Sequence, residues 1–356
     1  MENVKVTVWL STYNQEPYVA QALDSILMQR TDFPFEIIAA DDCSTDRTQE
    51  IILNYQKRYP GKIVTFFPEH NLGGCRKLTG CIDAGLFRGE YLSYLEGDDY
   101  WLEEDRLQTL VDFLEANPEY SRVSYRRKVI DENGNDKGFD IPKSVLNKPF
   151  TVEDFLFGKN YSDFGGVFRN YFKQCGSKYH ELFWASRNVL DFQDMFITQD
   201  FGPVFVMDAV YGVYRSVSVE GAQNYNSITP IAKRRRESIR IAQAVERFYN
   251  GKYDLSPLIR QDRLRLLTLA VEAQDTEELS KLREEIPLQQ RKELLAEIIY
   301  LAQRGKRKKE LTFLKKQLCS KEKRGLDMLV AKYSAQRVKM KLTGNRPNQK
   351  LRGYVR

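Results

Sequence analysis

Two acidic clusters in this chain of 356 residues each follow a short apolar run, and their residue types suit metal and nucleotide chemistry. They are Asp41 and Asp42 after residues 35–40, and Glu96, Asp98 and Asp99 after residues 91–95. Mg²⁺ and Mn²⁺ prefer oxygen ligands and keep positions open for substrate phosphates when only one or two carboxylates bind them. Open α/β sheets bind ligands beyond the carboxyl ends of their strands. The clusters therefore predict a nucleotide and metal site.

Alternating strand and helix patterns must position these carboxylates. Residues 4–10, 35–40, 62–67 and 91–95 have the composition of strands, and an amphipathic helix pattern follows each of them. Successive strand–helix units predict a parallel sheet with right-handed crossovers. The acidic residues after the second and fourth strands then lie at the same edge of that sheet.

The remainder of the chain differs in composition and sequence pattern. Residues 121–130 and 204–213 indicate two more strands, within a stretch that otherwise mixes aromatic, glycine and short apolar segments. From about residue 230 the pattern changes to long, Lys- and Arg-rich helices, for which a stacked arrangement is plausible. We therefore expect an α/β domain over residues 1–229 and a basic α-helical region over residues 230–356.

Charge divides the chain at nearly the same place. Residues 1–230 contain 23 Lys and Arg residues against 34 Asp and Glu residues, whereas the rest of the chain contains 32 against 15. The first part is thus strongly acidic and the second strongly basic. Such an asymmetry indicates that one part holds the chemistry and the other meets a polyanionic partner or surface.

Composition argues against several classes of protein. Two histidines and five widely spaced cysteines without a Cys-x-x-Cys pair argue against a zinc site, so carboxylates must carry any metal chemistry. No apolar run approaches the roughly 20 residues that cross a bilayer. The chain enters a strand directly, without a signal-peptide pattern. We expect a cytoplasmic protein with reduced thiols, either free or at the inner face of the cell membrane.

Four ordered motifs resemble the family 2 glycosyltransferases of the GT-A fold over about residues 4–220. They are Ser11-Thr12-Tyr13-Asn14, Asp41-Asp42-x-Ser44-Thr45-Asp46, Gly89-Glu90-Tyr91 and Glu96-Gly97-Asp98-Asp99-Tyr100-Trp101. The resemblance implies a Rossmann-like, mostly parallel sheet, with a nucleotide-sugar half at about 1–130 and an acceptor half at about 131–229. It also implies an inverting transfer from a nucleotide sugar, commonly UDP-linked, to an acceptor hydroxyl, assisted by Mn²⁺ or Mg²⁺.

The resemblance also implies roles for individual residues. Ser11, Tyr13 and Asp42 are expected at the nucleobase and ribose, and the residues after the fourth strand at ribose and metal, with Asp98 and Asp99 as metal ligands. The expected nucleotide-binding set is Ser11, Tyr13, Glu16, Asp42, Arg76, Lys77, Glu96 and Asp98. Two positions depart from the family pattern: Glu96 replaces its first aspartate, and the histidine that often follows a Tyr-Arg pair is absent after Tyr214-Arg215.

An acceptor hydroxyl is a poor nucleophile until its proton is removed, and inversion by direct displacement requires a base opposite the leaving group. The family's spacing upstream of the Tyr-Arg pair places this base near residues 191–194. We favour Asp191 over Asp194. The alternative for each is that it caps a helix running toward Phe201.

Two basic runs mark the second part of the chain, at residues 233–236 and 306–309. The simplest interpretation is a solvated helix face. Attraction to anionic lipid headgroups comes next and would suit a lipid-linked or exported glycan acceptor. Nucleic acid comes last, because no recognisable binding module accompanies the runs.

The leading hypothesis is a metal-dependent glycosyltransferase for surface polysaccharide or another glycan. The alternative is a non-catalytic subunit that binds a nucleotide sugar or glycan and docks through its basic tail, which the absent histidine favours. A nucleotidyltransferase of related fold is third, because no glycine-rich basic phosphate loop directly follows the first strand.

Overall fold

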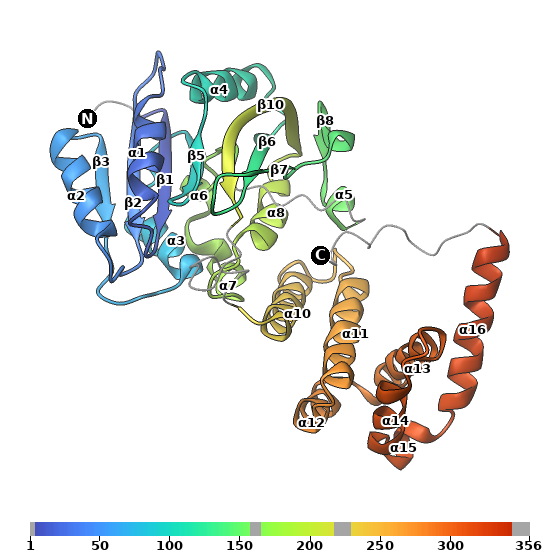
Figure 1. Ribbon diagram of the computed structural model, residues 1–356. Coiled ribbons are helices and arrows are strands. Elements are labelled where there is room, and N and C mark those ends of the chain that lie inside the picture. The colour runs from blue at the N-terminus through green and yellow to red at the C-terminus, as the bar shows by residue number, and fades with distance from the viewer. Residues whose placement is uncertain (1–3, 157–164, 217–228, 344–356) are drawn as a thin grey trace. The chain divides into compact units, whose positions relative to one another are not determined.

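The computed structural model describes residues 4–156, 165–216 and 229–343 (Figure 1). These residues form two compact units, one up to Thr229 and one from Pro230. The predicted acceptor half and the predicted helical region lie partly outside the described residues. Each unit has its own hydrophobic core.

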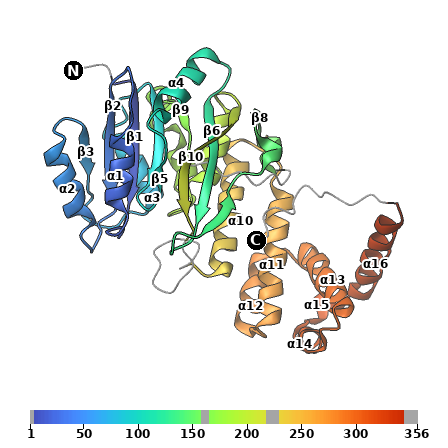
Figure 2. The ribbon, with the colours of Figure 1, turned by 45° about the horizontal axis from the view of Figure 1, so that its top comes forward.

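The first unit begins with four strands that alternate with three helices, as the sequence predicts. These elements are β1 (Val6–Thr12), α1 (Val19–Leu27), β2 (Phe35–Asp41), α2 (Thr48–Arg58), β3 (Ile63–Phe66), α3 (Gly74–Asp83) and β4 (Tyr91–Glu96). The strands pair in parallel in the order β3-β2-β1-β4 (Figure 2). One boundary differs from the prediction: Ser11 and Thr12, expected in a loop, are the last residues of β1, because both pair with β2.

The second half of the sheet is mixed. It contains β5 (Tyr100–Trp101), α4 (Arg106–Ala116), β6 (Arg122–Ile130), β7 (Asp136–Phe139), η1 (Lys143–Val145), β8 (Lys148–Phe150), α5 (Val152–Leu156), β9 (Val167–Arg169), α6 (Phe172–Cys175), η2 (Gly176–Tyr179), α7 (His180–Phe183), α8 (Asp191–Gln199) and β10 (Val204–Arg215). The short β9 lies antiparallel between β4 and β6. β10 pairs in parallel with β6 and antiparallel with β5 and β8. Parallel pairing, as predicted, thus joins β1–β4 and also joins β6 to β10. Between these two groups lies β9, which pairs antiparallel with both and therefore needs no crossover helix.

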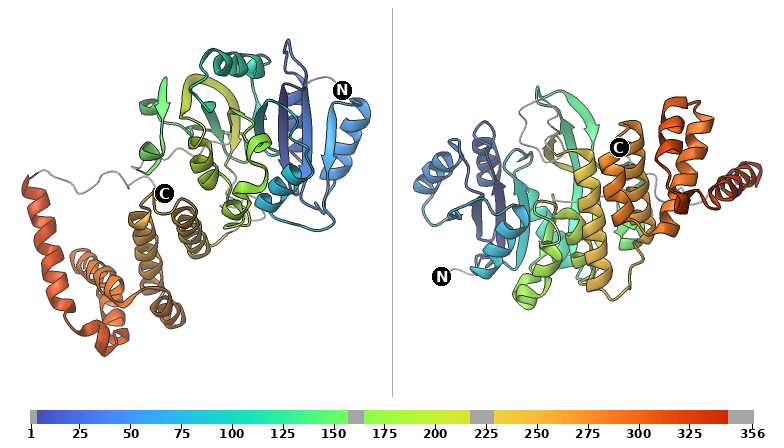
Figure 3. Two further views of the ribbon diagram at one scale, coloured as in Figure 1. Left: turned by 180° about the vertical axis from the view of Figure 1, so that it is seen from behind. Right: turned by 90° about the horizontal axis from the view of Figure 1, so that it is seen from below.

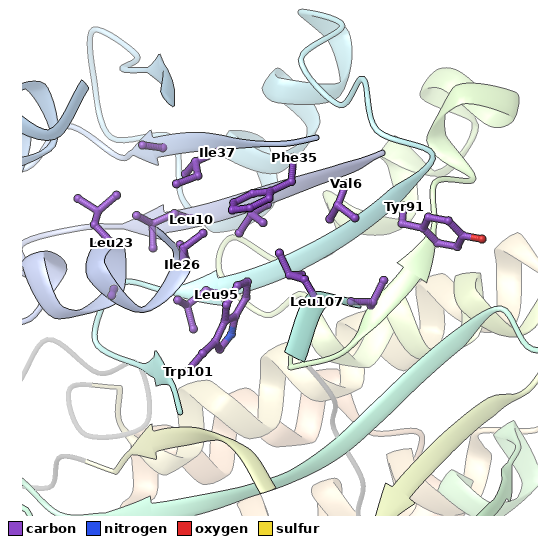
Figure 4. Close-up of a cluster of buried hydrophobic side chains, with 14 of the residues drawn as sticks. Val6, Leu10, Leu23, Ile26, Phe35, Ile37, Tyr91, Leu95, Trp101 and Leu107 are labelled. Atoms are coloured by element: carbon purple, nitrogen blue, oxygen red, sulfur yellow. The ribbon is translucent and has the colours of Figure 1, made fainter. Parts of the chain in front are cut away.

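The central strand β1 is buried on both faces, as expected for a parallel sheet covered by helices. Successive side chains of a strand point to opposite faces. Val6, Val8 and Leu10 belong to the core cluster with α1, α2 and α4 (Figure 4). Trp9 faces the other side, where the Nζ of Lys77 in α3 lies 5.7 Å from its ring centroid. Packing on both faces holds the end of β1 in place.

The described part of the second unit, residues 230–343, consists of helices and their connections, in agreement with the prediction (Figure 3). Its helices are α10 (Ile231–Phe248), α11 (Ser256–Glu272), α12 (Thr276–Glu285), α13 (Leu288–Arg304), α14 (Lys308–Gln317), α15 (Ser320–Lys323) and α16 (Leu326–Thr343). α13 contacts α11, α14, α15 and α16 around a core of Leu, Ile, Val and Ala side chains. Within the described ranges of the chain, no helix is long and apolar enough to cross a membrane.

Candidate active site

Strand register brings the two acidic clusters to one edge of the sheet. Ser11, near the end of β1, pairs with Ala40 of β2 on one side and with Glu96 of β4 on the other. The chain stays attached beyond the strand end, where the backbone N–H of Asp42 donates to the carbonyl oxygen of Thr12 at 3.0 Å. The carboxyl ends of β1, β2 and β4 therefore meet, as the sequence predicts.

Glycine is required between the acidic residues of the second cluster. A Cβ on Gly97 would lie 2.6 Å from Cγ2 of Thr12 and would also collide with the side chain of Gln15. The missing side chain allows the turn after β4 to lie against the loop between β1 and α1. This contact holds the second cluster beside the residues that follow β1.

The two residues of the first cluster have different surroundings. Asp41 is fully buried, and its carboxylate accepts hydrogen bonds from the backbone N–H of Ser44 (2.8 Å), Nε2 of Gln49 (2.7 Å) and Oγ1 of Thr12 (2.9 Å). A carboxylate with this many protein donors has little capacity left for a ligand. Asp41 thus stabilises the loop after β2.

Asp42 organises the loop after β3. Its Oδ1 accepts from the backbone N–H of Leu72 at 2.7 Å, and its Oδ2 accepts from that of Gly73 at 2.8 Å. Nδ2 of Asn71 donates to the carbonyl oxygen of Asp42 at 2.9 Å. Each carboxylate oxygen has a second acceptor position, so the predicted contact of Asp42 with a nucleoside remains compatible with these bonds.

The same loop connects the first cluster with the start of α8. Nη2 of Arg187 donates to Oδ1 of Asn71 at 2.6 Å, and the backbone N–H of Cys75 donates to the carbonyl oxygen of Arg187 at 3.0 Å. The backbone N–H of Gly74 donates to Oδ1 of Asn188 at 3.2 Å. Through these bonds, the segment directly before Asp191 is fastened to the loop that Asp42 holds.

A buried lysine lies beneath the sheet edge. Nζ of Lys77 donates to Oγ of Ser11 and to the carbonyl oxygen of Thr12, both at 3.0 Å. Burial lowers the pKa of Lys77, and the nearby carboxylate of Glu96 opposes that shift. The preceding residue, Arg76, is exposed, with its guanidinium 4.7 Å from the ring centroid of Trp184. Lys77 therefore fixes the end of β1, while Arg76 is accessible from solvent.

The second cluster concentrates negative charge in a desolvated place. Burial raises the pKa of Glu96 to about 7, with Lys77 opposing the shift. Burial also raises the pKa of Asp98, and burial together with the charge of Asp98 raises the pKa of Asp99 well above its usual value. Carboxylates that the protein does not fully compensate would be stabilised by a bound cation.

The two predicted metal ligands differ in accessibility. Oδ1 of Asp99 accepts the backbone N–H of Arg215 at 2.9 Å, and its Oδ2 lies 3.8 Å from Nη1 of Arg127. Asp98 is partly exposed. Among the residues that the structure describes, no three His, Cys, Asp or Glu side chains form a metal-binding group. A cation held by one or two carboxylates and by substrate phosphates fits this donor set, with Asp98 as the better-placed ligand.

Arg127 was not among the residues predicted for the site. This residue lies in β6, and its Nε donates to Oδ2 of Asp140 at 2.6 Å while its Nη1 faces Asp99. The proximity of Arg127 to the acidic cluster depends on the pairing of β6 with β10, which ends beside Asp99. Arg127 lowers the pKa of both Glu96 and Asp99 against the larger effect of burial. No local motif predicts such a contact.

The loop after β1 carries the remaining predicted nucleotide contacts. Tyr13 is 37% exposed, which leaves its ring available for stacking on a base. Oε2 of Glu16 accepts the backbone N–H of Arg47 at 3.1 Å, and the backbone N–H of Glu16 donates to Oδ2 of Asp46 at 3.0 Å. Glu16 thus joins this loop to the start of α2, and its contact with nucleotide stays a prediction.

The two candidate bases lie in different environments. Asp191 is the first residue of α8, is partly exposed, and accepts the backbone N–H of Phe192 at 3.0 Å. Asp194 is buried, pairs with Nη2 of Arg122 at 2.5 Å and accepts the hydroxyl of Tyr171 at 2.6 Å. Burial and these two partners favour a structural role for Asp194 and make Asp191 the more accessible of the two candidate bases.

We expect Asp194→Asn to destabilise the first unit by about 3–5 kcal/mol, because it leaves the buried guanidinium of Arg122 without its counter-ion. Denaturant unfolding measures this loss. Asp136→Asn, the same change at an exposed residue of β7, should alter stability by less than about 0.5 kcal/mol. An Asp194→Asn protein of unchanged stability that had lost sugar transfer would restore Asp194 as the base.

A sheet edge that gathers carboxylates, a buried lysine and an exposed tyrosine lies where open α/β domains bind their ligands. Residues 7–175 match the family described as glycosyl transferase family 2. This part of the chain is a family 2 glycosyltransferase domain, as the four motifs predict.

Curated relatives match part of the chain. An uncharacterised protein of Mycobacterium tuberculosis is 38% identical over 150 residues, which are 42% of this chain and 42% of that protein. Poly(ribitol-phosphate) β-N-acetylglucosaminyltransferase TarS of Staphylococcus aureus is 32% identical over 117 residues, 32% of this chain and 19% of TarS. The chain thus matches less than half the length of either relative.

Solved structures show the same fold. TarS residues 1–349 in complex with UDP-GlcNAc align with a TM-score of 0.57 and 17% identity, covering 94% of this chain and 92% of that one. The mannosyltransferase PcManGT from Pyrobaculum calidifontis, in complex with GDP-Man and Mn²⁺, aligns with a TM-score of 0.51 and 18% identity, covering 88% and 84%. At these identities the likeness concerns the fold.

Proposed function

We propose that the chain is a metal-dependent inverting glycosyltransferase that moves a sugar from a nucleotide sugar, commonly a UDP-sugar, to an acceptor hydroxyl. The observation that carries this proposal is that Asp42, Glu96 and Asp98 lie at the carboxyl ends of β2 and β4, the two strands that flank β1. Residues 71–75 fasten this edge of the sheet to the segment before Asp191. The bound UDP-GlcNAc of TarS and the bound GDP-Man of the mannosyltransferase support a nucleotide-sugar donor.

The donor half, about residues 1–130, would bind the nucleotide. In this proposal Tyr13 stacks on the base, while Asp42 and Glu96 accept hydrogen bonds from base or ribose. Lys77 keeps Ser11 and the end of β1 in position and supplies a fixed positive charge. Arg76, exposed at the start of α3, is available for the phosphates.

Asp98, with Asp99 beside it, would hold Mn²⁺ or Mg²⁺, and the Mn²⁺ in the mannosyltransferase structure supports this choice of cofactor. A bound divalent ion supplies a Lewis acid for the diphosphate leaving group, whose negative charge grows as the glycosidic bond breaks. Asp99 contributes by accepting the N–H of Arg215, which ties the end of β10 to the cluster.

Asp191 would act as the base in the acceptor half, about residues 131–229. Its carboxylate takes the proton of the acceptor hydroxyl while the hydroxyl oxygen attacks the anomeric carbon. The bond from that carbon to the diphosphate oxygen breaks, and its electron pair leaves with the nucleoside diphosphate. Attack from the face opposite the leaving group gives inversion.

The acceptor is proposed to be a glycan or a lipid-linked glycan, in the synthesis of a surface polysaccharide or a related polymer. The similarity to TarS, a poly(ribitol-phosphate) β-N-acetylglucosaminyltransferase, supports an acceptor of that class. The cytoplasmic location expected from the sequence stays a prediction.

A panel of nucleotide sugars tested by thermal shift with Mn²⁺ examines the donor claim. A ligand that binds only the native state at about 100 times its Kd adds about 2.7 kcal/mol of stability. We expect one nucleotide family to raise Tm in the presence of Mn²⁺ and to raise it less in EDTA. If no nucleotide or nucleotide sugar shifted Tm under either condition, the proposed donor site would be wrong.

The second candidate is a non-catalytic subunit that binds a nucleotide sugar or glycan. The observation that favours it is Tyr214-Arg215 without a following histidine. Donor binding without transfer or donor hydrolysis, across a panel of acceptors, would support this candidate over the enzyme.

A further inference from the structure

The two basic runs of the helical unit differ in how far ion pairs compensate their charges. In the first run, Nη1 of Arg235 lies 3.1 Å from Oδ1 of Asp262. Arg236 pairs with Glu278 at 2.7 Å and with Glu285 at 3.1 Å. These arginines connect α10 with α11 and α12, so their charges are compensated inside the unit. Arg235 and Arg236 of the first run are therefore part of the packing of the unit.

The second run belongs to a larger basic segment, residues 304–324. It contains ten basic side chains and only two acidic ones, Glu310 and Glu322. Glu322 is buried and already pairs with Arg291 at 2.7 Å and with Arg283 at 3.3 Å. Its negative charge is therefore unavailable to the basic side chains around it.

Most of these basic charges face solvent. Arg307 pairs with Glu272 at 2.9 Å. Within the part of the chain that the structure describes, the other nine form no ion pair and are exposed: Arg304, Lys306, Lys308, Lys309, Lys315, Lys316, Lys321, Lys323 and Arg324. The segment thus presents nine exposed basic side chains whose charges no ion pair among the described residues compensates.

Helical geometry gathers four of these lysines on one face of α14. At 3.6 residues per turn, Lys308, Lys309, Lys315 and Lys316 fall within an arc of about 120°. The buried Leu314 lies on the opposite side of the helix and belongs to the core of the unit. The apolar side therefore anchors α14, and the lysine side is presented outward.

We propose that this lysine surface, formed by the exposed basic residues of 304–324, binds an anionic phospholipid bilayer. Basic side chains near an anionic bilayer each strengthen binding by about fivefold, and several act together. Leu301, three positions before the segment, and Met328, four positions after it, are 38% and 74% exposed. Apolar side chains beside basic ones suit the boundary between headgroups and acyl chains.

The same observations disfavour single-stranded nucleic acid and glycan polymers. Single-stranded nucleic acid binds to aromatic platforms on which bases stack. The only aromatic residue in 304–324 is Phe313, which packs against the core of the unit. Seven of the ten basic residues are lysines, which are compact point charges without the bidentate geometry that arginine offers to individual phosphates. An array of point charges fits an extended layer of headgroups.

Co-sedimentation of the full chain with vesicles tests the proposal, using phosphatidylcholine alone and phosphatidylcholine mixed with phosphatidylglycerol. We expect binding to the mixed vesicles only, and weaker binding as salt rises. K308Q/K309Q/K315Q/K316Q should weaken this binding by roughly 10²- to 10³-fold. Because all four side chains are exposed, the variant should keep its Tm and its nucleotide-induced thermal shift, so the outcome is separate from that of the proposed function.

The matched control removes four exposed lysines from the first unit, as K57Q/K143Q/K148Q/K173Q, which changes the net charge equally. It should bind the mixed vesicles within about threefold of the unmodified chain, because the proposed membrane contact is made by α14 and those four lysines belong to the other unit. If both variants lost vesicle binding equally, the effect would depend on net charge alone, and the proposal would be overturned. It would also fail if neutral vesicles bound equally well, or if the α14 variant lost binding to an anionic glycan polymer but not to vesicles.

Discussion

Asp98→Asn should lower the rate of sugar transfer by at least about 10³-fold and remove the effect of Mn²⁺ on UDP binding. The substitution keeps the size of the side chain but removes the charge that a divalent ion requires. The measurement is UDP affinity by calorimetry, with Mn²⁺ and with EDTA. In EDTA both proteins should bind UDP similarly, and only the unmodified protein should gain affinity when Mn²⁺ is added.

Asp99→Asn separates the two neighbouring carboxylates. Asp99 is buried and accepts the backbone N–H of Arg215, so its substitution should change stability as well as activity. Asp136→Asn, on the exposed strand β7, is the matched control that should change neither UDP affinity nor Tm. If Asp98→Asn kept the full Mn²⁺ effect while Asp99→Asn lost it at unchanged Tm, Asp99 would be the metal ligand in its place.

The first half of the fold was predictable because its signals are local. β1, β2 and β4 are rich in apolar and β-branched residues and are buried along their length, which is typical of strands covered on both faces of a parallel sheet. The acidic clusters mark the ends of β2 and β4. The end of β1 was misplaced by two residues, because Ser11 and Thr12 are polar and only their pairing with Ala40 and Asp41 of β2 keeps them in the strand.

The second half depends on contacts distant in sequence. The three-residue strand β9 carries too little pattern to be recognised, yet it joins β4 to β6. Arg122 and Asp194 are 72 positions apart, and both become buried only when β6, α6 and α8 pack together. Sequence spacing could not decide between Asp191 and Asp194, since residues three apart lie on neighbouring positions of a helix.

The two basic runs also could not be distinguished from the sequence, because contacts distant in sequence decide whether their charges are compensated. Residues 233–236 and 306–309 are equally basic in the sequence, and no local rule separates them. Arg235 and Arg236 are compensated because α11 and α12 bring Asp262, Glu278 and Glu285 beside them. Most of the second run has no such neighbour among the described residues. Only the packing of the helices shows which charges remain for a partner.

Asp191→Asn should lower kcat for transfer by about 10²- to 10⁴-fold while leaving donor affinity unchanged. Asparagine cannot accept the proton of the acceptor hydroxyl, but its amide oxygen can still accept the backbone N–H of Phe192. The start of α8, and with it the segment fastened to residues 71–75, should therefore be preserved. Steady-state transfer rates, together with the nucleotide-induced thermal shift of the same protein, measure the two effects separately.

Asp191→Glu and Asp194→Asn complete this test. Glutamate restores a proton acceptor at the start of α8, although displaced by one methylene, so part of the lost kcat should return. Asp194→Asn should instead lower stability and affect kcat only to the extent that less folded protein is present. If Asp191→Asn kept more than about a tenth of the original kcat, the proton would be going elsewhere, and another carboxylate of the first unit would have to be the base.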